Sequence, residues 1–251
     1  MNQGISIIKR EEYKNHPLLS RLLELHDIPE ELYIIGELPD VKIDEYGRAT
    51  PRILTVVGSR KHTEYGKNAT EKLISSLKGT DIVILSGLAL GIDGLAHNTA
   101  LKNNLPTIAI PGSGLSKKVL YPSTHLHLAE DIVSAGGVLI SELAPDARAA
   151  QWTFPARNRI MAALSDAVLI IEAEEKSGTL ITGRQALELG RDIGAVPGEI
   201  FSPSSKGTNT LIREGAYSIA SEDDLYALLH LSKDNYEGKE IRNFTEDEQL
   251  L

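Results

Sequence analysis

The sequence predicts an α/β protein of the doubly wound, Rossmann-like type, with a mostly parallel sheet and helices on both faces. Three observations predict it. Apolar runs too short for helices alternate along the chain with amphipathic segments of helical length. Several of these runs are apolar at successive positions, as parallel strands covered on both faces are. The runs also end in small-residue turns that lead directly into helices, which is typical of βα connections.

The regular alternation begins at Pro51, and it divides the chain into three parts. Residues 1–50 form a leader segment that we expect to pack on the core, with an amphipathic helix over 18–25 and a strand over 32–36. Within the leader, 41–50 is polar and is expected at the surface. Residues 51–230 form the Rossmann-like domain. Its predicted strands are 52–57, 81–85, 107–110, 138–141, 167–171, 192–196 and 217–220. Its predicted helices are 64–77, with Thr63 as the N-cap, one ending near 103, 124–134, one starting near 154, 180–189, 207–214 and 222–229.

Composition limits the classes of protein that the chain can belong to. The 251 residues include no cysteine, which excludes disulfides and thiolate metal sites. No apolar run approaches the roughly 20 residues that span a bilayer, and the N-terminus lacks a signal-peptide pattern. We therefore expect a soluble, cytoplasmic protein without a membrane partner. Residues 221–251 carry 9 acidic and 3 basic side chains, most of the net charge of −9. The acidic tail 231–251 is expected to be mobile.

Four of the predicted strands end in turns of small residues that open a helix. These turns are 58–60, 86–91, 111–114 and 177–179. Since the carboxyl ends of parallel strands share one edge, the turns should converge there, with backbone N–H groups at helix starts free to face an anion. Arg60 leaves a buried strand at this edge and is the clearest phosphate ligand.

A second basic segment lies upstream of the 177–179 turn. Arg157 and Arg159 are two residues apart on a predicted helix start, so they cannot both point the same way. We expect one of them to reach the crevice and the other to pair with a carboxylate such as Glu142 or Glu172.

Other chemistries find little support in the sequence. Neither a phosphate-binding loop ending in Gly-Lys-Ser/Thr nor the G-x-G-x-x-G dinucleotide fingerprint is present. His125 and His127 are two apart on a helix, which disfavours a shared metal. Asp93 is better explained as a partner of a helix start than as a general base. We predict no cofactor, no metal and no catalytic residue, because the loop serines have no evident His/Asp relay.

With these motifs in place, the chain resembles the DprA (DNA-processing protein A, Smf) family between about residues 52 and 219. The segments that carry the resemblance are VGSRKHTEYG (57–66), SGLALGIDGLAHNTAL (86–101), TIAIPGSGL (107–115), FPARNRIMAALSDAVLIIEA (154–173), SGTLITGRQALELGRDIGAVPG (177–198) and GTNTLIREGA (207–216). The resemblance implies an extended Rossmann-like domain in a non-enzymatic, homodimeric protein that binds single-stranded DNA. It also implies that the protein protects incoming DNA and helps load the RecA recombinase during natural transformation.

The resemblance also implies a set of DNA-contacting positions, which the anion crevice completes. The predicted DNA- and phosphate-binding residues are Gly58, Ser59, Arg60, Ser86, Gly87, Arg157, Asn158, Arg159, Lys176, Ser177, Gly178 and Thr179. One departure lies in the second loop. The family usually has SGLARGID there, and this chain has Leu90 in place of the arginine. Many relatives also carry a helical SAM-like domain before this region and a winged-helix domain after it. We expect either a short family member or a truncated chain.

Two other functions could use the same crevice. The span 159–182 is similar to the lysine-decarboxylase-like LOG phosphoribohydrolases, which cleave nucleotides. The glutamate of that family's motif is replaced by Thr182 here, so the usual acid/base group is missing. The third possibility is a sensor of nucleotides or of a signalling ligand.

Overall fold

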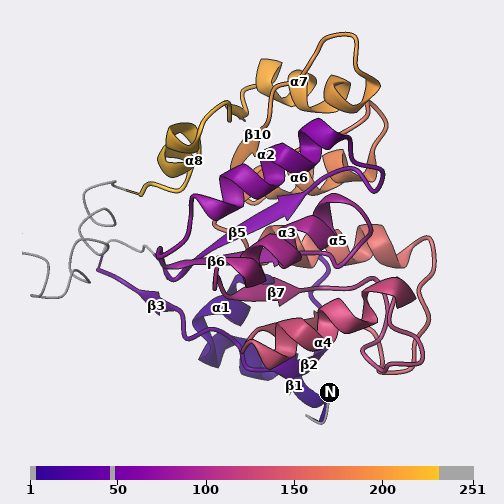
Figure 1. Cartoon of the computed structure of the whole chain (residues 1–251). Helices are drawn as coiled ribbons and strands as arrows, with labels where there is room; N and C mark the ends of the chain where they lie inside the picture. The colour runs from indigo at the N-terminus through magenta and orange to yellow at the C-terminus, as the bar shows by residue number, and fades with distance from the viewer. Residues whose placement is uncertain (1–3, 46–48, 232–251) are drawn as a thin grey trace, which may run out of the picture.

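The computed structural model describes residues 4–45 and 49–231 and confirms the predicted α/β fold. Its main sheet has nine strands in the order β1-β2-β8-β7-β6-β5-β9-β10-β11 (Figure 1). In this order, every neighbouring pair from β8 across to β11 is parallel. At the other edge, β2 is antiparallel to β8, and β1 is antiparallel to β2. The strands are β1 (Ser6–Lys9), β2 (Glu31–Gly36), β5 (Arg52–Val57), β6 (Ile82–Ser86), β7 (Thr107–Ala109), β8 (Val138–Ser141), β9 (Ala167–Ile170), β10 (Asp192–Ala195) and β11 (Tyr217–Ser218).

Helices cover both faces of this sheet. One face is covered by α2 (Glu64–Ser75), α3 (Ile92–Lys102), α4 (Leu126–Ser134) and α8 (Glu222–Leu228). The other is covered by α5 (Thr153–Leu164), α6 (Gly178–Glu188) and α7 (Lys206–Arg213), together with the leader. Because both faces are packed, the central strands are apolar at nearly every position, and β6 and β9 are buried along their whole length. Among the described residues, no helix is long and apolar enough to cross a membrane.

The leader differs in detail from its prediction. The single helix expected over 18–25 is a short α1 (Pro17–Ser20) that continues as a 3-10 turn over Arg21–Glu24. Strand β1 was not predicted, because only four residues form it and only one of them is even partly buried. The surface excursion contains a small hairpin of β3 (Lys42–Ile43) and β4 (Ala49–Thr50). The predicted mobile tail lies, apart from residue 231, outside the described residues.

The helix boundaries follow local chemistry. The Thr63 hydroxyl accepts a hydrogen bond from the Gly66 N–H and caps α2, as predicted. Helix α6 begins at Gly178, two residues earlier than expected, because the Ser177 hydroxyl caps it. At its other end, Gly190 has a φ of +69°, a left-handed conformation that suits glycine and stops the helix.

The order of winding reverses between β5 and β9. From β5 the chain moves through β6 and β7 to β8 on one side, and from β9 it moves through β10 to β11 on the other. The two strands are parallel neighbours, with Val57 opposite Ile170 at their carboxyl ends. The loops that follow them therefore leave the sheet side by side, at the point where open α/β sheets form a crevice.

Candidate functional site

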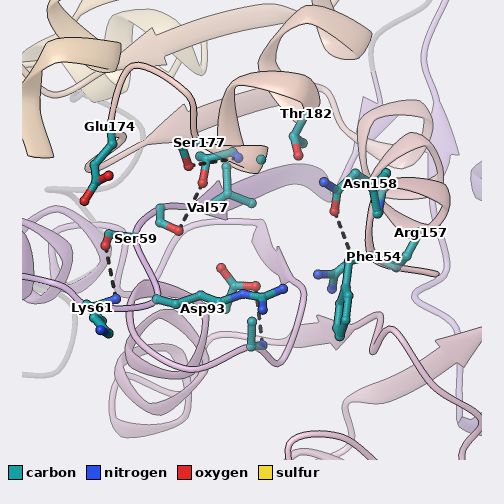
Figure 2. A pocket seen from close by; sticks show the side chains of 16 residues that line it. Val57, Ser59, Lys61, Asp93, Phe154, Arg157, Asn158, Glu174, Ser177 and Thr182 are labelled. Carbon is teal, nitrogen blue, oxygen red and sulfur yellow. Dashed lines mark hydrogen bonds between the residues drawn. The ribbon is translucent and has the colours of Figure 1, made fainter. Parts of the chain in front are cut away.

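A cavity of about 380 Å³ lies at this switch point. Its walls come from the loop after β5, the loop between β9 and α6, and the first turns of α5 (Figure 2). The predicted residues that line it are Gly58, Ser59, Arg60, Arg157, Asn158, Ser177, Gly178 and Thr179. Arg60 and the 177–179 turn, which are more than 110 positions apart in the sequence, thus share one cavity.

The start of α6 forms one wall of the crevice. The Ser177 hydroxyl accepts a hydrogen bond from the Thr179 N–H at 3.2 Å, and the Thr179 hydroxyl donates to the Gly58 carbonyl at 3.1 Å. The second bond ties the two loops together. No atom lies within 4 Å of where a Cβ of Gly178 would stand, so an incoming group has open access there. The first-turn amides of a helix lack intrahelical partners and carry a partial positive charge, which favours an anion at this wall.

Two cations of the loop after β5 face the crevice. Arg60 is exposed, yet its guanidinium lies 4.6 Å from the centre of the Phe154 ring, a cation–π contact that orients it. The next residue, Lys61, is also exposed, and its backbone N–H donates to the Ser59 hydroxyl at 3.1 Å. Within the described ranges, neither cation forms a salt bridge with a carboxylate. Both charges are therefore available to a ligand.

Arg157 lies on α5 and also lines the crevice, and its side chain is buried. Its guanidinium donates to the Ile110 carbonyl and, at 3.1 Å, to the Asn158 side-chain oxygen. A Cβ at Gly87 would stand 1.8 Å from the Arg157 guanidinium, so only glycine leaves room for it. Burial lowers the pKa of Arg157 to about 10, against the opposing attraction of Asp93. The side chain therefore stays charged at neutral pH.

Asp93 lies beneath the 86–91 loop and supports it. Its carboxylate accepts hydrogen bonds from the backbone N–H groups of Gly87 at 3.1 Å and Ala89 at 3.4 Å. Burial raises the pKa of Asp93, and the charge of Arg157 opposes this rise. Asp93 therefore stabilises the loop through these two hydrogen bonds, and its charge attracts the nearby Arg157 guanidinium. Asp93 does lie in the first turn of α3, but the hydrogen bonds of its carboxylate go to the preceding loop and not to the helix start that was predicted as its partner.

Four predicted residues do not line the cavity. The Ser86 hydroxyl donates to the Val56 carbonyl, and Gly87 forms the surface on which Arg157 lies. Lys176 is exposed on the loop before α6. Arg159 points away and contacts both oxygens of Glu142, at 2.6 and 3.0 Å. The structure thus divides the two arginines as expected, with Arg157 in the crevice and Arg159 in an ion pair.

Some lining residues were not singled out from the sequence, chiefly Lys61 and Glu174. Lys61 directly follows Arg60, so its position in the same loop was a usable signal. The loop serines have structural partners, since Ser113 donates to the Gly114 carbonyl and accepts from the Tyr121 N–H. Within the described part of the chain, no group of histidine and carboxylate side chains has the arrangement of a metal site.

The fold and the crevice define a Rossmann-like protein with a cavity at its switch point, and the sequence identifies its family. A family model described as DNA recombination-mediator protein A matches residues 5–230, so the chain belongs to that family. Protein Smf of Escherichia coli is 38% identical over 222 residues, which are 85% of this chain and 57% of that protein. The chain thus spans little more than half the length of this relative.

Two solved structures agree with this assignment. DNA processing protein DprA of Streptococcus pneumoniae is 40% identical over 206 residues, 82% of this chain and 69% of that protein. Its crystal structure matches with a TM-score of 0.77 at 35% identity, over 90% of this chain and 74% of the other. The DprA of Helicobacter pylori, whose structure was described for its single-stranded DNA binding mode, matches with a TM-score of 0.74 at 29% identity. That match covers 94% of this chain and 98% of the other.

Proposed function

We propose that this protein binds single-stranded DNA in the crevice between the loops that follow β5 and β9. The observation that carries the proposal is the convergence of an uncovered helix start, two unpaired cations and an aromatic ring on one cavity at the switch point. The description of the Helicobacter pylori relative as a single-stranded DNA binder supports the same ligand.

The proposed binding mode relies on phosphates more than on bases. The start of α6 and the side chains of Arg60 and Lys61 would hold phosphate oxygens, with Asn158 and Ser59 as further donors. Phe154 offers a ring on which a base can stack, a contact that contributes about 1–3 kcal/mol per base in such proteins. Since phosphate contacts release counterions, affinity should fall steeply with salt and depend little on sequence.

The test compares Arg60→Gln with Arg213→Gln in oligothymidylate binding, measured by fluorescence anisotropy at several salt concentrations. Arg213 is an exposed cation at the end of α7 that does not line the cavity, and its variant changes the net charge by the same amount. We expect the Arg60 variant to bind about tenfold more weakly and to lose about one unit of the salt slope. Equal affinity and equal slope in the two variants would reject the crevice as the site.

Mononucleotides separate this proposal from its two alternatives. The LOG-like hydrolase requires a carboxylate where this chain has Thr182, which lines the crevice and is buried. We therefore expect no release of free base from nucleoside monophosphates. A nucleotide sensor would show thermal stabilisation by mono- or dinucleotides at concentrations where they also displace the oligonucleotide, whereas a strand-binding site should respond to them weakly.

We further propose that the protein acts as a cytoplasmic recombination mediator, a homodimer that protects incoming single strands and helps load RecA. Family membership supports this role. The corresponding domain organisation is a leader over 1–50, a DNA-binding domain over 51–230 and an acidic tail over 231–251. Light scattering tests the dimer, and a RecA loading assay on protein-coated strands tests the role. A monomer without effect on RecA would contradict it.

A further inference from the structure

We propose that the bound strand leaves the crevice past Phe154 and enters a second subsite between the loops 118–123 and 148–151. This inference rests on the proposed function and gives it a direction. The opposite exit, past Glu174, would then stay free of DNA. In Figure 2, Glu174 and Phe154 lie at opposite ends of the crevice.

The second subsite is a separate cavity of about 540 Å³ that shares a wall with the first. Phe154 lines both cavities, so a chain crossing this ring passes from one to the other without leaving the surface. The polar and aromatic side chains around it are Lys118, Tyr121, Ser123, Arg148 and Gln151. A nucleic-acid strand needs this combination, because its phosphates require cations and its bases require rings.

The two cations of this cavity have no competing partners. Lys118 and Arg148 are exposed, and neither forms an ion pair in the part of the chain that the structure describes. The adjacent Lys117 differs, because it forms an ion pair with Glu130. No carboxylate lines the cavity. Its charge is therefore net positive, although the chain as a whole is acidic.

Aromatic side chains mark the path between the two cavities. The rings of Tyr121 and Phe154 are 5.7 Å apart and tilted by 60°, and Arg60 lies on the Phe154 ring. Tyr121 lines the second cavity and is 45% exposed, a large value for an aromatic side chain. An exposed ring beside two cations that form no ion pair among the described residues offers a surface that a nucleic-acid strand can cover.

The other end of the crevice leads toward several carboxylates. A third cavity of about 550 Å³ is lined by Glu64, Glu172 and Glu199, and Glu172 lies on the same loop as Glu174. Glu172 is buried and accepts hydrogen bonds from the Thr63 backbone and side chain, so it caps the start of α2. Glu64 and Glu199 are exposed. These carboxylates would repel phosphates, although Glu64 also pairs with Lys67 at 3.2 Å, so the strand should gain more energy in the direction of Lys118 and Arg148.

The test uses oligothymidylates of increasing length and two matched double variants. Lys118→Gln/Arg148→Gln removes the cations of the second subsite, whereas Lys78→Gln/Arg213→Gln removes two exposed cations elsewhere. For oligonucleotides that exceed the first cavity, we expect the first variant to bind about tenfold more weakly, with a salt slope lower by about two. For the shortest oligonucleotides, both variants should match the wild type.

The outcomes separate this inference from the function on which it rests. Loss of long-strand affinity in both double variants alike, or in neither, would overturn the second subsite while Arg60→Gln still tests the crevice. Strengthened binding of long strands by Glu64→Gln/Glu199→Gln, with no effect of Lys118→Gln/Arg148→Gln, would place the exit on the other side. If Arg60→Gln also has no effect, the proposed function itself fails.

Intrinsic fluorescence gives a second readout, because Trp152, the only tryptophan of the chain, directly follows Gln151, which lines the second cavity. Stacking of a base on an indole quenches its emission. We expect little quenching by the shortest oligonucleotides and a distinct increase once the strand is long enough to enter the second subsite. Quenching that is complete with the shortest oligonucleotide, or absent with the longest one that binds, would contradict the proposed path.

Discussion

The arginines on the leader side of the molecule and those at the crevice differ in what they contact. Arg21 donates to the Leu164 carbonyl and to Asp166, Arg191 to the Ala163 carbonyl and to Glu24. Arg159 pairs with Glu142 and also reaches Asp27 of the leader. The side chains of these three arginines are only 11–18% exposed. Each joins the leader to the core.

At the crevice the pattern is reversed. Arg60 and Lys61 are exposed and have no carboxylate partner in the described ranges, and Arg60 has an aromatic ring instead. A cation that already holds a carboxylate gains little from a phosphate, because it would have to break the first contact. The comparison therefore separates structural cations from those available to a ligand, although all of them look alike in the sequence.

The largest expected effect tests the structural side of this comparison. Arg159→Gln leaves Glu142, which is 17% exposed, without its bidentate partner. Removing one member of a pair this deeply placed should lower the free energy of unfolding by about 3 kcal/mol. Urea denaturation measures it. Single-stranded DNA affinity of the folded variant should stay within twofold of the wild type, with an unchanged salt slope.

A double variant serves as the control. Arg159→Gln/Glu142→Gln removes both charges and should recover part of the lost stability, because no uncompensated carboxylate remains. A drop in DNA affinity and salt slope similar to that of Arg60→Gln would show that Arg159 contacts the strand and would break the comparison.

Sequence reasoning reached the fold because the apolar runs and the capping residues are local signals. The strand over 138–141 and the Thr63 cap were predicted at the residues where the structure has them. The convergence of Arg60 with the 177–179 turn also followed, since the edge of a parallel sheet fixes which loops meet. Strand β1 could not be predicted, because its four residues gain their order from pairing with β2.

The sequence predicts only in part which charged residues face the crevice and which form ion pairs. The spacing of Arg157 and Arg159 shows that they diverge, but which one enters the crevice depends on how α5 packs. Gly87 explains the outcome, because its missing side chain leaves the space that the Arg157 guanidinium fills. The positive second cavity also could not be predicted from the sequence, because only the fold brings its loops 118–123 and 148–151 together.

The second-largest expected effect is a pH dependence of the free energy of unfolding that comes from His97. His97 is buried on α3, with Nδ1 2.8 Å from the Thr107 hydroxyl, which donates to the Ile84 carbonyl. Burial lowers the pKa of His97 from 6.5 to about 3, and His125 and Arg157 nearby add to the shift. The unfolded chain therefore takes up this proton first. Stability should be constant above about pH 6.5 and fall as pH decreases toward 3.

From pH 7 to pH 5, this single group should cost roughly 2 kcal/mol of unfolding free energy. His97→Gln cannot take up the proton, so its stability should decrease less over the same interval, whatever its stability at pH 7. Urea denaturation of both proteins at the two pH values gives the difference. Equal losses in the two proteins would mean that His97 is not held neutral in the fold.

The smallest expected effect comes from adding a cation at position 90, beside the crevice. Leu90 is 44% exposed, and the adjacent Gly91 lies against the backbone of Ser59 and Arg60, which places position 90 beside the crevice cations. Leu90→Arg should strengthen single-stranded DNA binding two- to fivefold and raise the salt slope by about one, a modest gain because Arg60 repels the new charge. Leu90→Gln, which is polar but uncharged, is the control and should leave the slope unchanged. If Leu90→Arg bound no better than Leu90→Gln, an unpaired cation at this rim would not suffice for binding, and the contrast with the paired arginines of the leader would lose its functional meaning.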